Sequence, residues 1–109
     1  MDEVAGRLRA GADETAERAA ILGGLAEGTV EAVSKGANIA PYPTGLTDLG
    51  KHVEALVERY RTFGSKLRDA IRQADDASDA GTADLFTGFS RTVEKDAWFI
   101  GANAPESGR

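Results

Sequence analysis

The 109-residue sequence contains no cysteine and only one histidine, His52, and these two features exclude several kinds of site. A chain without cysteine has no disulfide framework, no thiolate zinc site and no cysteine nucleophile. A single histidine cannot supply two imidazole ligands to one metal ion. No apolar run approaches the length of a membrane span, and the charged N-terminal segment lacks the apolar stretch of a signal peptide. We therefore expect a soluble, cytoplasmic protein with no membrane partner.

Strand patterns, internal repeats and phosphate-binding loops are absent as well. Without a Gly-rich loop or a nucleophile elbow, kinase and hydrolase functions can be set aside. The sequence has 13 Lys and Arg against 18 Asp and Glu, a net charge of −5, which argues against binding nucleic-acid phosphates through the folded surface. A chain of this length has room for one buried core, so we expect a single domain over residues 1–109.

Three long stretches place apolar residues every three or four positions, which is the spacing of one face of an α-helix. The first covers residues 4–22 and is ended by Gly23 and Gly24. The longest covers residues 49–74, and Thr47 is the residue that we expect to cap its N-terminus. Both stretches are typical of amphipathic helices that bury one face.

The rest of the chain adds one short helix, one long helix and the segments that connect them. We expect a short helix within residues 26–36, a loop over 36–46, a break over 74–82 and a last helix from about 85 to 103. The predicted class is all-α, a helical bundle of three long helices and one short one. A bundle usually needs four comparable helices, so one apolar face should be uncovered. The chain then either associates through that face or lacks a helix that belongs before its first residue.

Three carboxylates of the first predicted helix share one stripe. Asp2, Asp13 and Glu17 are separated by eleven and four residues, rotations of about 20° and 40° at 100° per residue. Asp13 and Glu17 lie one turn apart and repel each other, and a hard cation bound between them would reverse that cost. Asp2 lies about 16 Å further along the axis, so it could join the same ion only from another chain.

A two-fold axis near the middle of this helix would bring Asp2 of one chain beside Asp13 and Glu17 of a second, giving two equivalent sites per dimer. The alternative is a solvated acidic face, because acidic residues spaced by four are common on helices. Spacing alone favours that alternative.

Several segments give the sequence a wider resemblance. They are Asp13-Glu14-Thr15-Ala16-Glu17-Arg18 followed by Leu22-Gly23-Gly24, then Gly28-Thr29, Tyr42-Pro43 and Arg59-Tyr60, and finally Thr82-Ala83-Asp84-Leu85 with Arg91, Lys95, Trp98 and Phe99. In their residue types and in their order along the chain, these segments resemble the Dps family of ferritin-like proteins, the mini-ferritins that protect DNA during starvation. The resemblance runs from Met1 to about Asn103.

This resemblance implies a subunit of a twelve-subunit shell that oxidises Fe(II) with hydrogen peroxide, stores the ferric product and so protects DNA. It implies ferroxidase centres at two-fold interfaces, where one subunit gives two histidines and an aspartate, and its partner gives an aspartate and a glutamate one turn apart. Asp13 and Glu17 match the latter pair, and Asp2 matches the former aspartate. Iron is therefore the metal that we expect these three residues to bind.

The sequence departs from the family at its start. The family's first helix, with both histidine ligands and a His-Trp-Asn segment, has no counterpart, because Met1 lies next to the residue that matches the helix-two aspartate. The chain thus resembles the C-terminal two-thirds of a subunit. His52 lies on another helix, where we expect an exposed or capping role. Without imidazoles the site would be all-carboxylate, which suits Fe(II) weakly and Mg or Mn about as well.

An acidic corner joins the last two predicted helices and contains Asp75, Asp76, Asp79 and Asp84. The matching corner of the family lines a three-fold pore, so Asp75, Asp79 and Asp84 are predicted pore residues that would concentrate cations. The alternative is that acids near a helix N-terminus simply stabilise the helix. Further along, we expect the segment 98–100, Trp-Phe-Ile, to lie in the core.

Three function classes remain. The first is a metal-oxidising storage subunit, the second is a helical interaction module whose carboxylate stripe is only a solvated face, and the third is a nucleoid protein that acts through DNA. Family members that bind DNA directly generally use a mobile basic tail, and neither MDEVAG nor the C-terminal segment 104–109, APESGR, supplies one. We therefore favour the storage subunit and expect no direct DNA binding.

Overall fold

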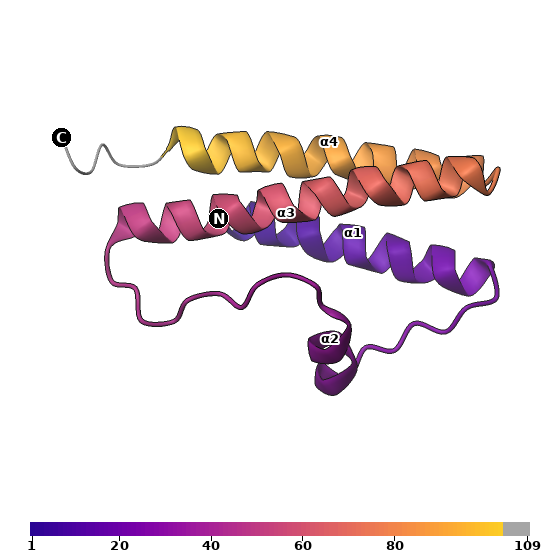
Figure 1. Cartoon of the computed structure of the whole chain (residues 1–109), viewed down its shortest axis with the longest axis horizontal. Coiled ribbons are helices and arrows are strands. Elements are labelled where there is room, and N and C mark those ends of the chain that lie inside the picture. Colours follow the sequence, from indigo (N-terminus) through magenta and orange to yellow (C-terminus); the bar gives the residue numbers. More distant parts are fainter. Residues whose placement is uncertain (104–109) are drawn as a thin grey trace. The chain divides into compact units, whose positions relative to one another are not determined.

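The computed structural model describes residues 1–103 and contains helices but no strand in that range, which confirms the predicted all-α class. Four helices follow one another, α1 (Asp2–Ile21), α2 (Val30–Gly36), α3 (Leu49–Asp76) and α4 (Ala80–Ala102) (Figure 1). The chain forms two compact units, residues 1–38 and a second that begins at Ile39. We predicted that the C-terminal segment 104–109 supplies no basic tail for binding DNA. This segment lies outside the described residues.

The C-terminus of α1 explains why the sequence carries two glycines there. Gly23 has a φ of +89°, in the left-handed region, and the Gly24 amide donates to the Ala19 carbonyl at 2.7 Å. This is the Schellman arrangement, in which a left-handed residue turns the chain away and satisfies the last free carbonyls. A Cβ on Gly24 would lie 3.1 Å from the Ala19 oxygen, so the second position is also restricted. The predicted end of the first helix is confirmed.

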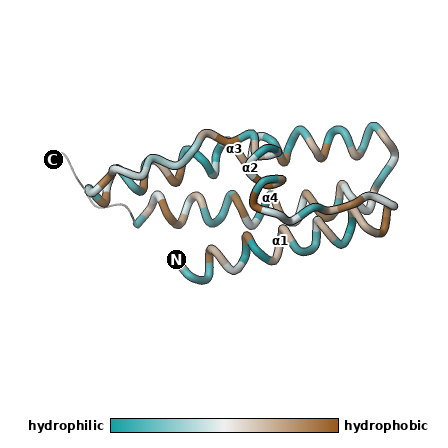
Figure 2. The backbone as a smooth tube through the Cα atoms, turned by 90° about the horizontal axis from the view of Figure 1, so that it is seen from below, coloured by the Kyte–Doolittle hydropathy of each residue, from teal (hydrophilic) through white to brown (hydrophobic). Residues whose placement is uncertain are grey.

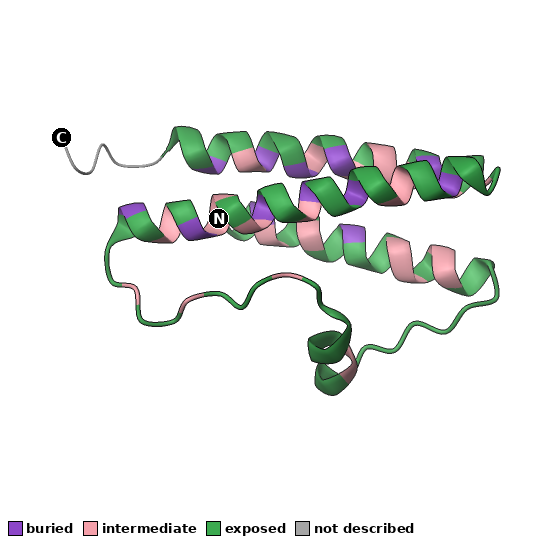
Figure 3. Ribbon diagram, viewed as in Figure 1, coloured by how far each residue is buried: buried purple, intermediate pink, exposed green. Residues whose placement is uncertain are grey.

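The short helix α2 lies within the range predicted for it. Thr29 caps it, since its hydroxyl oxygen accepts a hydrogen bond from the Ala32 amide at 3.1 Å. No residue of α2 is buried, and Val30 and Val33 are 81% and 58% exposed (Figure 3). Apolar side chains of α2 therefore face outward in the single chain.

The unit that begins at Ile39 is built around α3 and α4, which lie side by side and run in opposite directions (Figure 1). The long helix begins one residue later than predicted. Asp48, not Thr47, is the N-cap, because its carboxylate accepts a hydrogen bond from the Lys51 amide at 3.2 Å. The prediction of Thr47 is wrong because Thr and Asp are both good caps and spacing alone does not separate neighbours.

The predicted break over residues 74–82 is too long, because only residues 77–79 lie outside the helices. The Asp79 amide donates to the Ala74 carbonyl at 2.8 Å and the Ser78 amide to the Asp75 carbonyl at 3.0 Å, a second Schellman arrangement. Ser78 occupies the left-handed position with a φ of +57°. The left-handed residue after a helix is usually glycine. Because serine occupies this position here, the sequence did not predict so short a turn.

The seam between α3 and α4 is closed by small and aromatic side chains. Phe63 and Phe89 meet edge to face with ring centroids 5.6 Å apart. A Cβ built on Gly101 would touch Val57 at 3.8 Å, so the helices approach closely at that end. Val93 is 1% exposed, the lowest value among the buried apolar residues. Buried positions recur along both helices (Figure 3).

The expected core position of segment 98–100 is wrong for two of its three residues. Ile100 is 5% exposed, but Trp98 and Phe99 are 70% and 50% exposed. Buried residues of α4 include Val93, Asp96 and Ile100, spaced by three and four. Trp98 precedes Ile100 by two positions, a rotation of about 200°, and so points away from that stripe.

Hydrophobic residues along the helices stand in short groups that hydrophilic residues interrupt (Figure 2). Accordingly, none of the helices within residues 1–103 is both long and apolar enough to cross a membrane.

Candidate metal centre

The three predicted ligands all lie on α1 and are all exposed. Asp13 and Glu17 are one helical turn apart, and neither makes a hydrogen bond or an ion pair with any residue of the described range 1–103. Their oxygens are therefore available to a ligand. Two carboxylates at this spacing can contact one hard cation, because oxygen donors are what such cations prefer.

The structure does not bring the third predicted ligand to this pair within one chain. Asp2 belongs to the first turn of the same continuous helix, about 16 Å along the axis from Asp13. Among residues 1–103 no group of three or more His, Asp or Glu side chains could hold a metal ion. Asp13 and Glu17 thus form a half-site, and completing it requires ligands from elsewhere.

The first turn of α1 also offers Asp2 a simpler role. Asp2 and Glu3 both lie in that turn, where negative charge interacts favourably with the helix dipole. Met1 is the N-cap and makes no side-chain capping bond, so the acidic side chains are the polar groups that favour this end. The assignment of Asp2 as a ligand remains a prediction.

At the acidic corner, the structure gives Asp79 a defined local role. Its carboxylate accepts hydrogen bonds from the amide and the hydroxyl of Thr82 and caps α4. Asp75, Asp76 and Asp84 are exposed. Capping is sufficient to explain an aspartate at position 79. The structure gives Asp75 and Asp84 no capping role. The assignment of Asp75, Asp79 and Asp84 to a pore stays a prediction.

Substitutions at Asp79 separate capping from pore lining. We expect Asp79→Ala to lower the free energy of unfolding by about 1 kcal/mol, because two donors lose their acceptor. Asp79→Asn keeps an oxygen acceptor and removes the charge, so it should cost only a fraction of that. Urea denaturation would measure both. Equal losses in the two variants would contradict the capping role.

His52 has no free ring nitrogen with which to ligate a metal. Its Nε2 donates to the Leu46 carbonyl at 2.7 Å, and its Nδ1 accepts from the Tyr42 hydroxyl at 2.7 Å. The Tyr42 ring also stacks on the imidazole, with centroids 5.8 Å apart. His52 is half-buried and anchors the preceding loop, so the expected exposed or capping role is wrong.

Arg59 secures the same loop from the next turns of α3. Its guanidinium donates to the Pro41 carbonyl at 2.6 Å and to the Ala55 carbonyl at 3.1 Å. The group also lies over the Tyr42 ring, 5.5 Å from its centroid, in a cation–π contact. The resemblance pointed to Tyr42 and Arg59 only as matching residues, and the structure explains them as a structural anchor.

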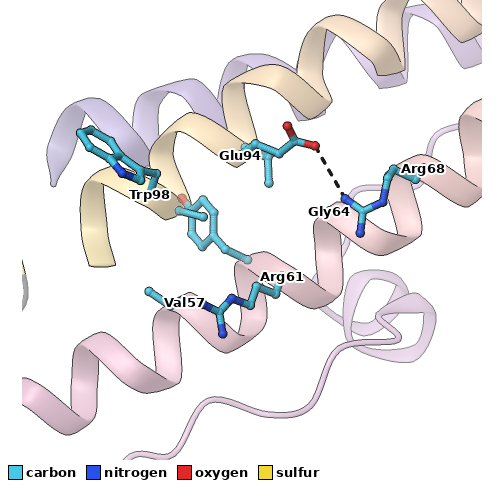
Figure 4. Close-up of a pocket in the computed structure, with 9 residues that line it drawn as sticks. Val57, Arg61, Gly64, Arg68, Glu94 and Trp98 are labelled. Carbon is cyan, nitrogen blue, oxygen red and sulfur yellow. Dashed lines mark ion pairs between the residues drawn. The ribbon is translucent and has the colours of Figure 1, made fainter. Parts of the chain in front are cut away.

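Sequence reasoning missed a cleft of about 330 Å³ between α3 and α4. Its lining includes Val57, Arg61, Gly64 and Arg68 from α3, and Glu94 and Trp98 from α4 (Figure 4). An available signal was the spacing of Arg61 and Arg68, seven residues apart on one helix face with a glycine between them.

Comparison with known protein families and sequences gives a consistent picture. A family model described as a ferritin-like domain matches residues 1–104. The DNA protection during starvation protein of Agrobacterium fabrum is 42% identical over 94 residues, 86% of this chain and 58% of that protein. DNA protection during starvation protein 1 of Deinococcus radiodurans is 28% identical over 101 residues, 93% of this chain and 49% of that protein. The chain thus spans about half the length of these relatives.

Solved structures agree with the sequence relatives. Dps from Thermosynechococcus elongatus superposes with a TM-score of 0.88 at 25% identity, covering 98% of this chain and 68% of that one. Dps from Staphylococcus aureus gives a TM-score of 0.77 at 26% identity, covering 85% of this chain and 62% of that one.

Proposed function

Because this chain belongs to the ferritin-like family, and within it to the Dps proteins, we propose that it works as an iron-handling subunit. It binds Fe(II), oxidises it with hydrogen peroxide, retains the ferric product and thereby protects DNA from oxidative damage. The observation that carries this proposal is the exposed pair Asp13 and Glu17, which lie one turn apart on α1 and have no hydrogen bond or ion pair with any residue of the range 1–103. They stand at the positions that match the aspartate and glutamate ligands implied by the resemblance.

In the proposed site, Asp13 and Glu17 contribute one half and a second subunit contributes the other, with Asp2 as its carboxylate. Oxygen ligands neutralise the charge of Fe(II) and hold it at the interface. A carboxylate pair alone binds Fe(II) weakly, so the ligands from the partner set the affinity. Self-association, as a shell of twelve in the family, is therefore part of the proposed function.

The proposed reaction is balanced by the two substrates. Two Fe(II) ions each give up one electron, the O–O bond of one hydrogen peroxide molecule breaks, and two hydroxide ions form. The carboxylates of Asp13 and Glu17 stabilise the higher charge of Fe(III) more strongly than that of Fe(II), which favours the electron transfer. Because the peroxide is consumed without releasing a radical, the DNA nearby is spared.

The remaining parts of the proposal concern the surroundings of the protein. Asp75, Asp79 and Asp84 draw cations towards the shell. The protein works in the cytoplasm, and it protects DNA without binding to the DNA directly. The alternative is a non-catalytic helical module that associates through its apolar faces. The exposed Val30 and Val33 favour association in either case.

A direct assay separates the two functions. The chain is loaded anaerobically with Fe(II) at a few ions per subunit, peroxide is added, and formation of Fe(III) is followed by absorbance. We expect oxidation faster than in buffer and two Fe(II) consumed per peroxide. A rate equal to that of buffer, in a sample that has assembled, would favour the helical module.

A further inference from the structure

We propose that Tyr42 and His52 form a redox site, in which the Tyr42 phenol gives one electron to a small one-electron oxidant and passes its proton to the His52 imidazole. The oxidants concerned are peroxide-derived radicals. One such radical forms when a single Fe(II) gives one electron to peroxide, which yields hydroxide and a hydroxyl radical. The inference goes beyond the proposed iron function, because both residues lie outside α1 and the site needs no bound metal.

The proton acceptor is aligned with the phenol in this structure. The Tyr42 hydroxyl donates to Nδ1 of His52 at 2.7 Å, at the short end of the range for hydrogen bonds. The Leu46 carbonyl accepts from Nε2 at 2.7 Å, and this contact fixes the tautomer in which Nδ1 carries no proton. The Tyr42 proton therefore faces a base, and no rearrangement has to precede its transfer.

The reaction moves one electron and one proton. The O–H bond of Tyr42 breaks, the proton forms an N–H bond with Nδ1 of His52, and the electron goes to the oxidant, so that a hydroxyl radical becomes hydroxide. The products in the protein are a neutral tyrosyl radical and an imidazolium. A one-electron reductant such as ascorbate then returns the electron, and the imidazolium returns the proton to the phenol oxygen.

The groups around His52 stabilise the positive charge that the transfer creates. The Leu46 carbonyl keeps its hydrogen bond with Nε2 when the imidazole becomes charged, and a hydrogen bond from a charged donor is stronger than one from a neutral donor. The protonated Nδ1 then donates to the phenoxyl oxygen of Tyr42, so the pair stays hydrogen-bonded. Both imidazole nitrogens therefore have an acceptor in the oxidised state.

Arg59 makes transfer of the electron alone unfavourable. Its guanidinium lies 5.5 Å from the centroid of the Tyr42 ring. A tyrosine that lost only an electron would be a cation beside this guanidinium, and two positive charges so close repel each other. Loss of the proton in the same step keeps the ring neutral. The rate of oxidation should therefore depend on the base, His52.

Tyr42 is also the tyrosine that an oxidant can reach. The chain has two tyrosines, of which Tyr42 is 40% exposed and Tyr60 is 6% exposed. The Tyr42 ring stacks on the His52 imidazole with centroids 5.8 Å apart, and Arg59 holds the adjacent Pro41 carbonyl at 2.6 Å. The exposed phenol is thus held next to its base, and Tyr60 provides an internal control.

Flash photolysis of the metal-free chain tests the site, with photogenerated ruthenium(III) tris-bipyridine as the one-electron oxidant. All variants carry Trp98→Phe, because the exposed indole of Trp98 would also react with this oxidant. We expect a tyrosyl radical in the absorbance and electron paramagnetic resonance spectra, and slower formation of that radical in heavy water, because a proton moves in the same step. Tyr42→Phe should abolish the signal, whereas Tyr60→Phe should leave it unchanged.

Replacement of the base is the decisive variant. His52→Phe keeps a ring against Tyr42 but removes the proton acceptor, so radical formation should slow by about tenfold or more, since a positioned general base typically contributes about 10²–10⁴-fold. Free imidazole added to His52→Ala should restore part of the rate, which a merely structural role of His52 would not allow. An unchanged rate in His52→Phe, or a radical that persists in Tyr42→Phe, would overturn the proposal. If both His52 variants fail to fold, equal rates in light and heavy water with His52 in place would overturn it instead.

The iron assay keeps this inference distinct from the proposed function. Asp13→Asn with Glu17→Gln should leave photo-oxidation of Tyr42 unchanged, because neither carboxylate takes part in it. Normal Fe(II) oxidation in a chain that forms no Tyr42 radical would refute the redox site alone. A Tyr42 radical that depends on His52, in a chain that does not oxidise Fe(II), would refute the iron function and support the redox site.

Discussion

Replacing Asp13 with Asn and Glu17 with Gln is expected to abolish the rapid peroxide-dependent oxidation of Fe(II) that we propose for this chain. The two substitutions keep the size and polarity of the side chains but remove both negative charges of the half-site. Amide oxygens bind a hard cation much more weakly than carboxylates do, and ligand charge largely sets such affinities. The expected readout is a fall of the initial oxidation rate to the level of buffer.

The same helix offers a control with an identical change in charge. Glu3→Gln with Glu14→Gln removes two exposed carboxylates that are eleven residues apart and cannot share an ion. Oxidation should continue at close to the unsubstituted rate in this variant. If both double variants lost activity equally, the negative charge of α1 as a whole would be responsible and the ligand assignment would be wrong.

The free energy of unfolding is a second readout for the double substitution of Asp13 and Glu17. It should rise slightly in the variant, whereas the oxidation rate should fall. Like charges one turn apart destabilise an exposed helix by about 0.2–0.5 kcal/mol, so the metal-free double variant should be slightly more stable. With Fe(II) present the unsubstituted chain should gain stability through binding, and the variant should not. A variant with raised stability and unchanged oxidation would identify the stripe as a solvated face.

The ends of the helices could be predicted from the sequence where the residue types at those ends determine the backbone conformation. Gly23 and Gly24 supply a left-handed residue and a close approach, and the end predicted from them agrees with the structure. The turn after α3 uses the same hydrogen bonds but places Ser78 at the left-handed position. Serine does not signal such a position, and the acidic, alanine-rich residues around it suggested a longer break.

The candidate site was predictable in part, for a similar reason. The relation of Asp13 to Glu17 follows from helical periodicity within one element, so spacing was enough. The cleft at Trp98 depends on which faces of α3 and α4 meet, and the apolar character of the segment 98–100 suggested the core for Trp98 instead. Anchors such as His52 with Leu46 join a loop to a helix, and no spacing rule encodes that contact.

Phe89→Ala is expected to have the largest effect on stability among the substitutions considered, with a loss of about 3 kcal/mol. Phe89 is half-buried and packs edge to face on Phe63 across the seam between α3 and α4. Removing a ring from a packed seam loses its transfer free energy and leaves a cavity, typically about 3–5 kcal/mol for a buried ring. Partial exposure places this site at the lower end of that range.

Phe99→Ala removes the same group from the same helix at a site that is 50% exposed, so it should cost less than about 1.5 kcal/mol. Urea denaturation of both variants would measure the difference. A double-mutant cycle with Phe63→Ala should then give a coupling of about 0.5–1.5 kcal/mol, the usual value for an aromatic pair. Equal losses at Phe89 and Phe99, or a coupling near zero, would mean that α3 and α4 do not meet through these rings. The cleft at Trp98, which lies in the same seam, would then lose its structural basis.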